Sequence, residues 1–178
     1  MSMIMVDIET LGTAKDAVIL SIGAVQFNEQ GVEKKFYVQI DPESCTDFGL
    51  KIDARTVMWW FDQNDAARKA LTSTKGVPLD LALNDLYDAF DWKDKQVWAN
   101  GIDFDFVILE NAFNAVGIKA PWMYWSKMDY RTVKNLVPRK VFEACRKDGG
   151  VSHNALADAI AQAATLVKLL KWVNHESD

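Results

Sequence analysis

Three features are scarce in this chain of 178 residues: cysteine, long apolar runs and an excess of basic charge. Its two cysteines, Cys45 and Cys145, have no Cys-x-x-Cys neighbour, which argues against a disulfide framework and a zinc site and favours a reducing compartment. No apolar run approaches the roughly 18–20 residues of a membrane span, and the first residues lack the pattern of a signal peptide. The sequence therefore predicts a cytoplasmic protein that does not enter a membrane.

Basic charge is concentrated in one part of the chain, although the net charge is −5. An acidic total argues against a protein that coats nucleic acid through bulk electrostatics. Between positions 127 and 147, however, basic residues outnumber acidic ones. This basic segment contains Lys127, Arg131, Lys134, Arg139, Lys140, Arg146 and Lys147. It is either an ordinary solvated surface or a strip that faces phosphate groups.

The order of predicted elements indicates one α/β domain over residues 1–178, with a frayed tail from about residue 174. A hydrophobic content of 49 % is enough for a substantial core, and no linker or internal repeat divides the chain. Short apolar or alternating runs predict strands at 3–9, 17–27, 34–40, 96–100 and 122–125. Helical spacing of apolar residues predicts helices at 53–71, 78–90, 105–117 and 152–173.

Connection lengths and capping signals refine this arrangement. The first three strands are joined by short, Gly-containing segments, so we expect them to form an antiparallel meander. The later strands alternate with helices, which predicts a mixed sheet with helices on both faces. Asp53 is a cap for the first long helix, Asn64 is a second start signal within it, and Ser152 or His153 begins the last one. Such sheets bind ligands near the carboxyl ends of their central strands.

The first strand contains the stretch VDIETLG, in which two acids occur where burial is expected. Residues two apart on a strand point to the same face, so Asp7 and Glu9 should project side by side. Burial and mutual repulsion disfavour two ionised carboxylates there, whereas a divalent cation such as Mg²⁺ or Mn²⁺ would favour them. The alternative is an edge strand with both acids in water.

Two further acidic groups occur at predicted helix starts. Asp103 and Asp105 follow the strand 96–100 and are either helix caps or metal ligands. His153 and Asp158 flank the start of the last helix, whose small alanines would let it lie close to the sheet and direct Asp158 inward. A solvated pair is the alternative for these two residues, and His175 in the polar tail is expected to be solvated.

Four or five carboxylates and one histidine at strand ends and helix starts are the residues that two-metal phosphodiester hydrolysis requires. Two cations roughly 3.5–4 Å apart clamp the attacking and leaving oxygens of an in-line displacement. A histidine accepts a proton from the attacking water, a role that suits an unperturbed pKa near ~6.5.

The chain resembles the DEDDh branch of the DnaQ-like 3′→5′ exonucleases, which share a ribonuclease-H-like fold. VDIETLGT is similar to their first motif D-x-E-T, NGIDFDFVIL to the second and HNALADA to the third, H-x4-D. The resemblance covers residues 4 to about 170, and TVMWWFDQ and WANGIDFDF are most similar to compact phage and prophage enzymes. It implies that Asp7, Glu9, Asp105 and Asp158 bind metal and that His153 is the general base. Asp103 is the alternate ligand of the second motif, although Asp105 fits the frame F-D-x3-[LF].

The resemblance also implies substrate contacts. Thr10 and Leu11 match positions that meet the terminal 3′ nucleotide, Gly12 gives the backbone room there, and Asn100 begins the second motif. Leu11 is equally compatible with core packing. Trp59 and Trp60 are neighbours on a predicted helix, where adjacent side chains diverge by about 100°, so one can be in the core while the other stacks on bases.

We therefore expect a 3′→5′ exonuclease that uses two Mg²⁺ or Mn²⁺ ions to release nucleoside 5′-monophosphates from the 3′ ends of single-stranded DNA or RNA. A homodimer is expected because many relatives form one. The alternatives are an inactive nucleic-acid-binding or scaffolding domain and a ribonuclease-H-like endonuclease. The endonuclease shares the carboxylates but does not require the histidine.

Overall fold

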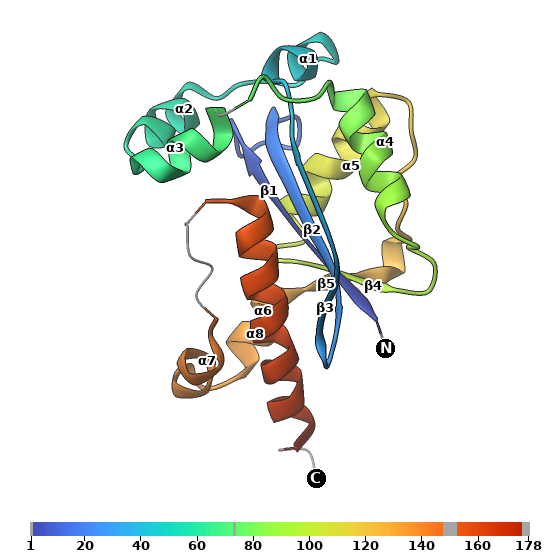
Figure 1. The fold of residues 1–178 in the computed structure, drawn as a ribbon, viewed down its shortest axis with the longest axis vertical. Helices are drawn as coiled ribbons and strands as arrows, with labels where there is room; N and C mark the ends of the chain where they lie inside the picture. The colour runs from blue at the N-terminus through green and yellow to red at the C-terminus, as the bar shows by residue number, and fades with distance from the viewer. Residues whose placement is uncertain (1, 73, 148–152, 176–178) are drawn as a thin grey trace.

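A five-stranded sheet forms the centre of the computed structural model, which describes residues 2–72, 74–147 and 153–175 (Figure 1). The strands lie in the order β3-β2-β1-β4-β5. Their bounds are β1 Met3–Thr10, β2 Ile19–Asn28, β3 Gly31–Gln39, β4 Gln96–Ala99 and β5 Lys127–Asp129. The pairs β1–β2 and β2–β3 are antiparallel, which confirms the predicted meander. Because β1, β4 and β5 are parallel, their carboxyl ends lie at one edge of the sheet.

Helices cover both faces of the sheet, as the sequence predicts (Figure 1). One face packs against α4 Leu79–Ala89 and α5 Asp105–Ala115. The opposite face packs against α6 Tyr130–Leu136, α7 Arg139–Cys145 and α8 Ala155–His175. The remaining helices are α1 Pro42–Asp47, α2 Ala54–Phe61, α3 Asp65–Thr72 and the 3₁₀ helix η1 Tyr124–Ser126. No helix among the described residues is long and apolar enough to cross a membrane.

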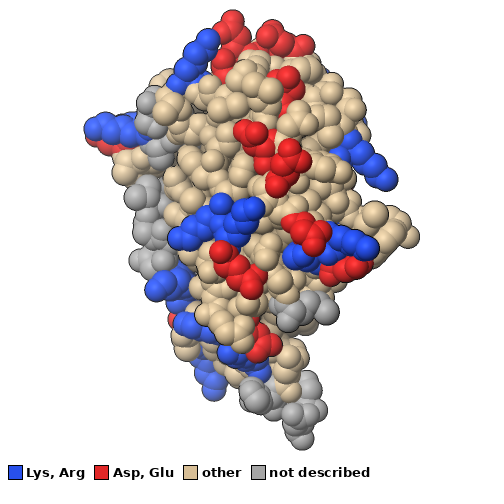
Figure 2. Space-filling model, turned by 45° about the vertical axis from the view of Figure 1, so that its right-hand side comes forward, with Lys and Arg blue, Asp and Glu red and all other residues tan. Residues whose placement is uncertain are grey.

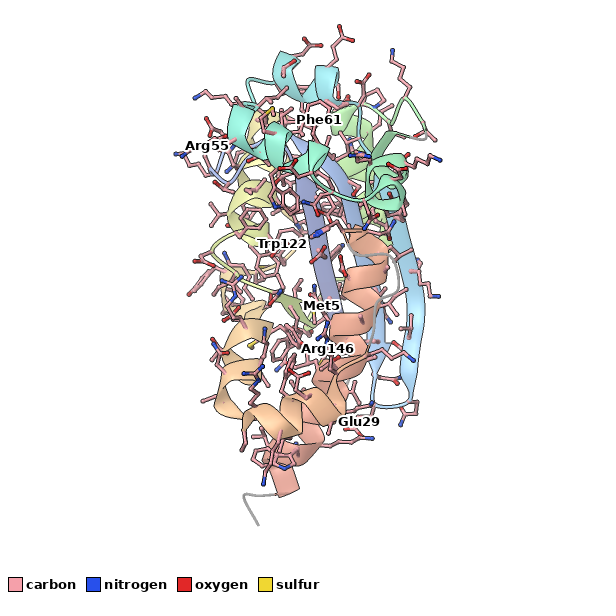
Figure 3. The ribbon with its side chains drawn as sticks, turned by 90° about the vertical axis from the view of Figure 1, so that its left-hand side faces the viewer. Met5, Glu29, Arg55, Phe61, Trp122 and Arg146 are labelled. Carbon is pink, nitrogen blue, oxygen red and sulfur yellow. The ribbon has the colours of Figure 1, made fainter. Side chains whose placement is uncertain are left out.

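Alternation along β1 divides its side chains between the two cores. Ile4, Val6 and Ile8 are buried against α4 and α5. Met3 and Met5 point the other way and join the core beneath α8, as the position of Met5 in Figure 3 shows. The next two residues on this second face are Asp7 and Glu9. The strand period therefore directs the two acids toward α8.

A glycine on β2 brings the start of α8 directly onto the sheet. Gly23 pairs with Asp7 across the β1–β2 ladder. A Cβ atom at Gly23 would lie 2.2 Å from the backbone carbon of Ala155 and 2.3 Å from the backbone nitrogen of Leu156, which is closer than real contacts allow. The first turn of α8 therefore lies beside Asp7 because position 23 has no side chain.

The structure divides the predicted helix 53–71 into α2 and α3, and side-chain caps explain the division. The Asp53 side chain accepts hydrogen bonds from the backbone N–H groups of Arg55 and Thr56 and begins α2. Asn64 accepts from the N–H of Ala67 and begins α3, so both start signals are used.

Some predicted elements and bounds differ from those of the structure. The strand expected at 122–125 is absent: η1 lies there, and the strand β5 follows it. The last helix begins at Ala155 rather than at 152: Asn154 caps it by accepting from the Ala157 N–H, and His153 lies just before this cap, while Ser152 lies outside the described residues. The short helices α1, α6 and α7 were not expected, because six or seven residues give too few periodic positions to recognise. The helix α8 continues through His175, and the rest of the tail, which we expect to be frayed, lies outside the described residues.

Candidate active site

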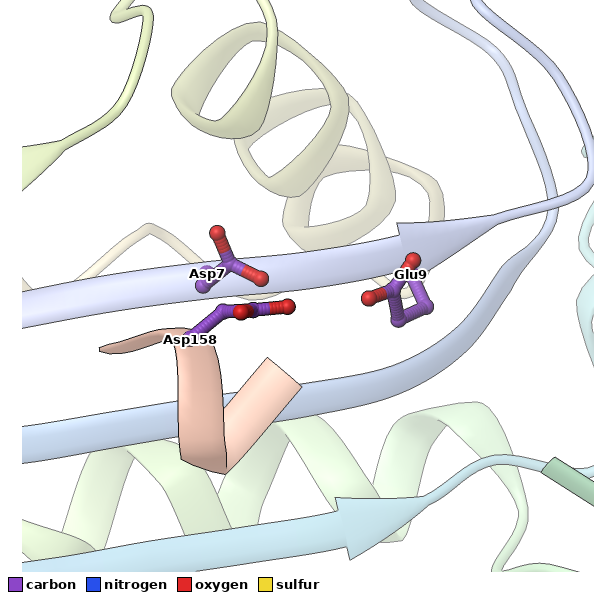
Figure 4. Close-up of side chains that lie close together, drawn as sticks. All are labelled: Asp7, Glu9 and Asp158. Carbon is purple, nitrogen blue, oxygen red and sulfur yellow. The ribbon is translucent and has the colours of Figure 1, made fainter. Parts of the chain in front are cut away.

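Three carboxylates converge between β1 and the first turn of α8. One side-chain oxygen from each of Asp7, Glu9 and Asp158 lies within 4.8 Å of the other two (Figure 4). Asp7 and Glu9 come from the α8-facing side of β1, and Asp158 follows the Asn154 cap on α8. We call these three residues the acidic cluster. Their spacing matches what a divalent cation needs from hard oxygen ligands.

Burial makes the negative charge of the acidic cluster costly. Burial is the largest cause that raises the pKa of Asp7 well above its ordinary value, and Asp105 and Glu9 raise it further. Burial and then Asp158 and Asp105 raise the pKa of Glu9 to about 8. Burial also raises the pKa of Asp158, partly offset by the nearby His153. A bound cation would reverse these effects, since it favours the ionised carboxylates.

Asp105 lies next to the acidic cluster but is not one of its members. It is the first residue of α5 and is buried, and its Oδ1 accepts a hydrogen bond of 3.3 Å from the Ile8 backbone N–H. Burial raises its pKa to about 7, while Arg131 acts in the opposite direction. Asp103 is exposed instead. The structure thus places Asp105, and not Asp103, against the strand that carries Asp7 and Glu9.

Gln162 contacts the acidic cluster and was not among the expected site residues. It lies one turn after Asp158 on α8, and its Nε2 donates a 2.9 Å hydrogen bond to Asp7 Oδ1. Its Oε1 is buried and finds no hydrogen-bond partner within the part of the chain that the structure describes. The i, i+4 spacing from Asp158 was the available sequence signal. A buried amide oxygen without a partner, on a residue that donates to Asp7, fits a site that holds a hydrated cation.

His153 lies at the approach to α8 with its ring against two tryptophans. Its φ of 62° is in the left-handed region, which residues with a side chain seldom adopt. The imidazole centroid is 4.9 Å from the Trp59 ring and 5.8 Å from the Trp60 ring, both edge-on. Asp158 is within electrostatic range of it. The predicted general base therefore stands beside the acidic cluster and packs on α2.

Trp60 is buried and Trp59 is exposed, as expected for adjacent residues on a helix, whose side chains diverge. Trp60 is 7 % exposed and donates from its indole N–H to the Thr10 carbonyl at 2.9 Å, whereas Trp59 is 44 % exposed. Both line a cavity of about 590 Å³ that reaches Glu9, which we call the tryptophan pocket. Its walls are Ile8, Glu9, Thr10, Gly12, Thr13, Asp53, Arg55, Thr56, Trp59, Trp60 and Phe104. Leu11 does not line it and packs against the core instead.

A second cavity, of about 730 Å³, begins at Asp158 and runs between α6, α7 and α8. Four members of the basic segment line it, namely Lys134, Arg139, Arg146 and Lys147, together with Asn100 and Gln162. We call it the basic groove; Arg146 lies close to α8 in Figure 3. By contrast, basic and acidic side chains are interspersed on the face in Figure 2.

The other members of the basic segment have different surroundings. Lys127 forms a 2.8 Å ion pair with Glu110, and Arg131 donates to the Asn100 backbone carbonyl. Lys140 is exposed and does not line the groove. The acidic cluster is consequently flanked by an aromatic cavity at Glu9 and a cationic one at Asp158.

Comparison with solved structures identifies the fold. The zinc-bound E. coli ExoI–ssDNA complex matches with a TM-score of 0.69 and 16 % identity, over 98 % of this chain and 41 % of that one. The nuclease domain of 3′hExo, described as a DEDDh family member bound to rAMP, matches with a TM-score of 0.63 and 16 % identity, over 96 % and 92 % of the two chains. The chain thus spans about two fifths of ExoI. No relative among curated proteins matches the sequence.

The family model, together with the fold, assigns the chain to the DnaQ-like 3′→5′ exonuclease class, with the ribonuclease-H-like architecture that the motifs imply. Within that class, the chain belongs to the family described as the Rv2179c-like 3′-5′ exoribonuclease domain, whose model matches residues 2–170. The expected similarity to phage and prophage enzymes stays a prediction.

Proposed function

We propose that this protein removes nucleoside 5′-monophosphates from the 3′ ends of single-stranded nucleic acid, with RNA as the preferred substrate. The observation that carries the proposal is the convergence of Asp7, Glu9 and Asp158 within 4.8 Å, in a member of an exonuclease family. The family description names an exoribonuclease, and 3′hExo is a neighbour bound to rAMP. ExoI in complex with ssDNA is also a neighbour, so the sugar preference needs its own test.

Asp7, Glu9, Asp158 and the adjacent Asp105 would hold two Mg²⁺ or Mn²⁺ ions. The donor set fits such ions because it consists of clustered carboxylates, and Gln162, whose amide oxygen has no partner among the described residues, donates to one of them. When bound, these ions supply Lewis-acid activation of a phosphodiester and of water. The carboxylates that would hold the ions come from three elements, the strand β1, the start of α8 and, for Asp105, the start of α5.

His153 is the proposed general base. Its position before α8, within electrostatic range of Asp158, places an imidazole next to the acidic cluster. The neutral ring would take the proton of the attacking water. Its edge contacts with Trp59 and Trp60 orient the ring, so a substrate base entering the tryptophan pocket would meet the same aromatic surface.

The two cavities give the substrate a direction. The 3′-terminal nucleotide would lie in the tryptophan pocket, where exposed Trp59 offers a stacking surface and the backbone of Thr10 and Gly12 is near. The strand on its 5′ side would follow the basic groove, where Lys and Arg side chains meet phosphates. This order puts the last phosphodiester beside the acidic cluster.

Digestion of matched single-stranded oligonucleotides tests the proposal. We expect 5′-end-labelled RNA to yield a ladder shortened from its 3′ end in Mg²⁺ or Mn²⁺, DNA to be cut more slowly, and EDTA to stop both reactions. A circular single strand should stay intact. Cleavage of the circle would indicate an endonuclease, and inertness on every substrate would indicate a binding domain.

A further inference from the structure

We infer that Gln162 is a positioning residue of the metal site, which fixes the Asp7 carboxylate and accepts a hydrogen bond from a water on the bound cation. The inference rests on the proposed function and deepens it, because it assigns a role to a residue that the motif pattern does not include. Gln162 lies one turn beyond Asp158, so a single helix presents both residues to β1.

The chemistry of the contact fixes the orientation of the Gln162 amide. The Gln162 amide nitrogen faces Asp7 Oδ1 at 2.9 Å, which is the orientation that an ionised, cation-binding carboxylate requires because it can only accept hydrogen bonds. The amide oxygen is then directed away from that carboxylate. The hydrogen bond holds the Asp7 carboxylate in one orientation within the acidic cluster.

The amide oxygen has no evident structural purpose. Gln162 Oε1 is buried and lacks a partner among the described residues, which is uncommon because an unmade hydrogen bond in the interior is costly. The residue also lines the basic groove next to Asp158. A water held by a cation in the acidic cluster would donate to this oxygen, and residues that hold a ligand in place in this way strongly affect metal affinity.

The test measures the affinity of the full chain for Mn²⁺, by calorimetry and by the electron spin resonance signal of free Mn²⁺. The wild type is compared with the variants Gln162→Leu and Gln162→Asn. Leucine removes both hydrogen bonds, while asparagine keeps the polarity but shortens the reach by one methylene. Both variants should bind Mn²⁺ about 10–100-fold more weakly. In RNA digestion, kcat at low Mn²⁺ should fall and recover in excess Mn²⁺, with KM for the oligonucleotide nearly unchanged.

Gln26→Leu is a matched control. Gln26 also donates a 2.9 Å hydrogen bond to a carboxylate, Glu33 Oε2, but on the β2–β3 pair away from the acidic cluster. The Gln26→Leu variant should bind Mn²⁺ with the affinity of the wild type. Mn²⁺ affinity in both Gln162 variants equal to that of Gln26→Leu would overturn the inference while the proposed function stands. A wild-type protein that binds no Mn²⁺ would instead overturn both.

Discussion

Glu9 is a single residue at which the acidic cluster lowers the free energy of unfolding. Its side chain is 8 % exposed, and burial with two neighbouring acids raises its pKa from 4.5 to about 8. The folded state therefore binds a proton at Glu9 that the unfolded state releases at intermediate pH. Stability from this group is intact below about pH 4.5 and falls as pH rises toward about 8.

Glu9→Gln removes that ionisation and should abolish exonuclease activity while stabilising the metal-free protein. In EDTA, the free energy of unfolding of the wild type should fall between pH 5 and pH 8 by about 1–4 kcal/mol more than that of the variant. Urea unfolding at the two pH values measures this. Glu33→Gln is the control, because exposed Glu33 has a pKa lowered by its hydrogen bonds from Gln26 and Ser2. Equal pH dependence of the wild type and Glu9→Gln would contradict the prediction.

His153→Ala tests the proposed base separately from the metal site. The rate in saturating Mn²⁺ should fall by ~10²–10⁴ because the attacking water loses its proton acceptor. Mn²⁺ affinity should change little, since the carboxylates remain on β1 and α8. Steady-state kinetics on end-labelled RNA, with Mn²⁺ titration alongside, separates the two quantities. A large loss of Mn²⁺ affinity would instead make His153 part of the metal site.

Individual site residues were predictable to different degrees. The two-residue period of a strand was enough to place Asp7 and Glu9 on one face, as β1 has them. Only the frame F-D-x3-[LF] of the resemblance favoured Asp105 over Asp103, because which side chain turns under β1 to reach the Ile8 N–H cannot be read from the sequence. The i, i+4 spacing of Gln162 from Asp158 puts both on one face of α8, but the contact of Gln162 with Asp7 appears only once α8 lies beside β1.

At the scale of elements, the docking of α8 on β2 depends on Gly23. A side chain there would collide with the backbone of Ala155 and Leu156 and push the helix, with Asp158, away from Asp7. Gly23→Ala should therefore lower the free energy of unfolding by about 1–3 kcal/mol or more and weaken Mn²⁺ binding. Chemical unfolding and Mn²⁺ titration measure the two effects.

Gly31→Ala provides the comparison for that prediction. Gly31 has a φ of 136°, and a Cβ there meets nothing within 4 Å, so the substitution adds backbone strain without a collision. It should cost stability but leave Mn²⁺ affinity unchanged. Loss of Mn²⁺ affinity in Gly31→Ala would mean that general destabilisation, not helix displacement, explains the effect of Gly23→Ala.

The helix α7 offers a neighbouring pair for testing the basic groove. Arg139 lines the groove and Lys140 does not. Arg139→Ala should raise KM for a single-stranded oligonucleotide and reduce the slope of log KM against log salt concentration by about 0.7. Lys140→Ala removes the same charge from the same helix and should change neither. Equal effects of the two substitutions would show that only overall charge matters.

Elements with many periodic positions were predictable, and short ones were not. The meander and α4, α5 and α8 follow from alternation and from helical spacing. The strand β5 has only three residues and is held by its ladder with β4, so nothing local distinguishes it. The apolar letters of 122–125 have strand propensity, but the chain turns there as η1.

For the whole molecule, the metal links catalysis to stability. An ion that binds only the folded protein stabilises it by about 2.7 kcal/mol when its concentration is 100 times Kd. Mn²⁺ should therefore raise the Tm of the wild type above its value in EDTA. Asp158→Asn should show little or no such rise, because it removes a carboxylate of the acidic cluster. Thermal scans with and without Mn²⁺ measure the difference, and an undiminished rise in the variant would place the ion elsewhere.

The acidic cluster joins the first strand of the sheet to its last helix, so the two halves of the site are made at different times. During synthesis, Asp7 leaves the ribosome long before Asp158, and the meander can pair while α8 is still absent. A nascent or prematurely terminated chain would carry two of the three carboxylates and no closed centre. The metal site that we propose therefore cannot form until α8 has docked on the sheet.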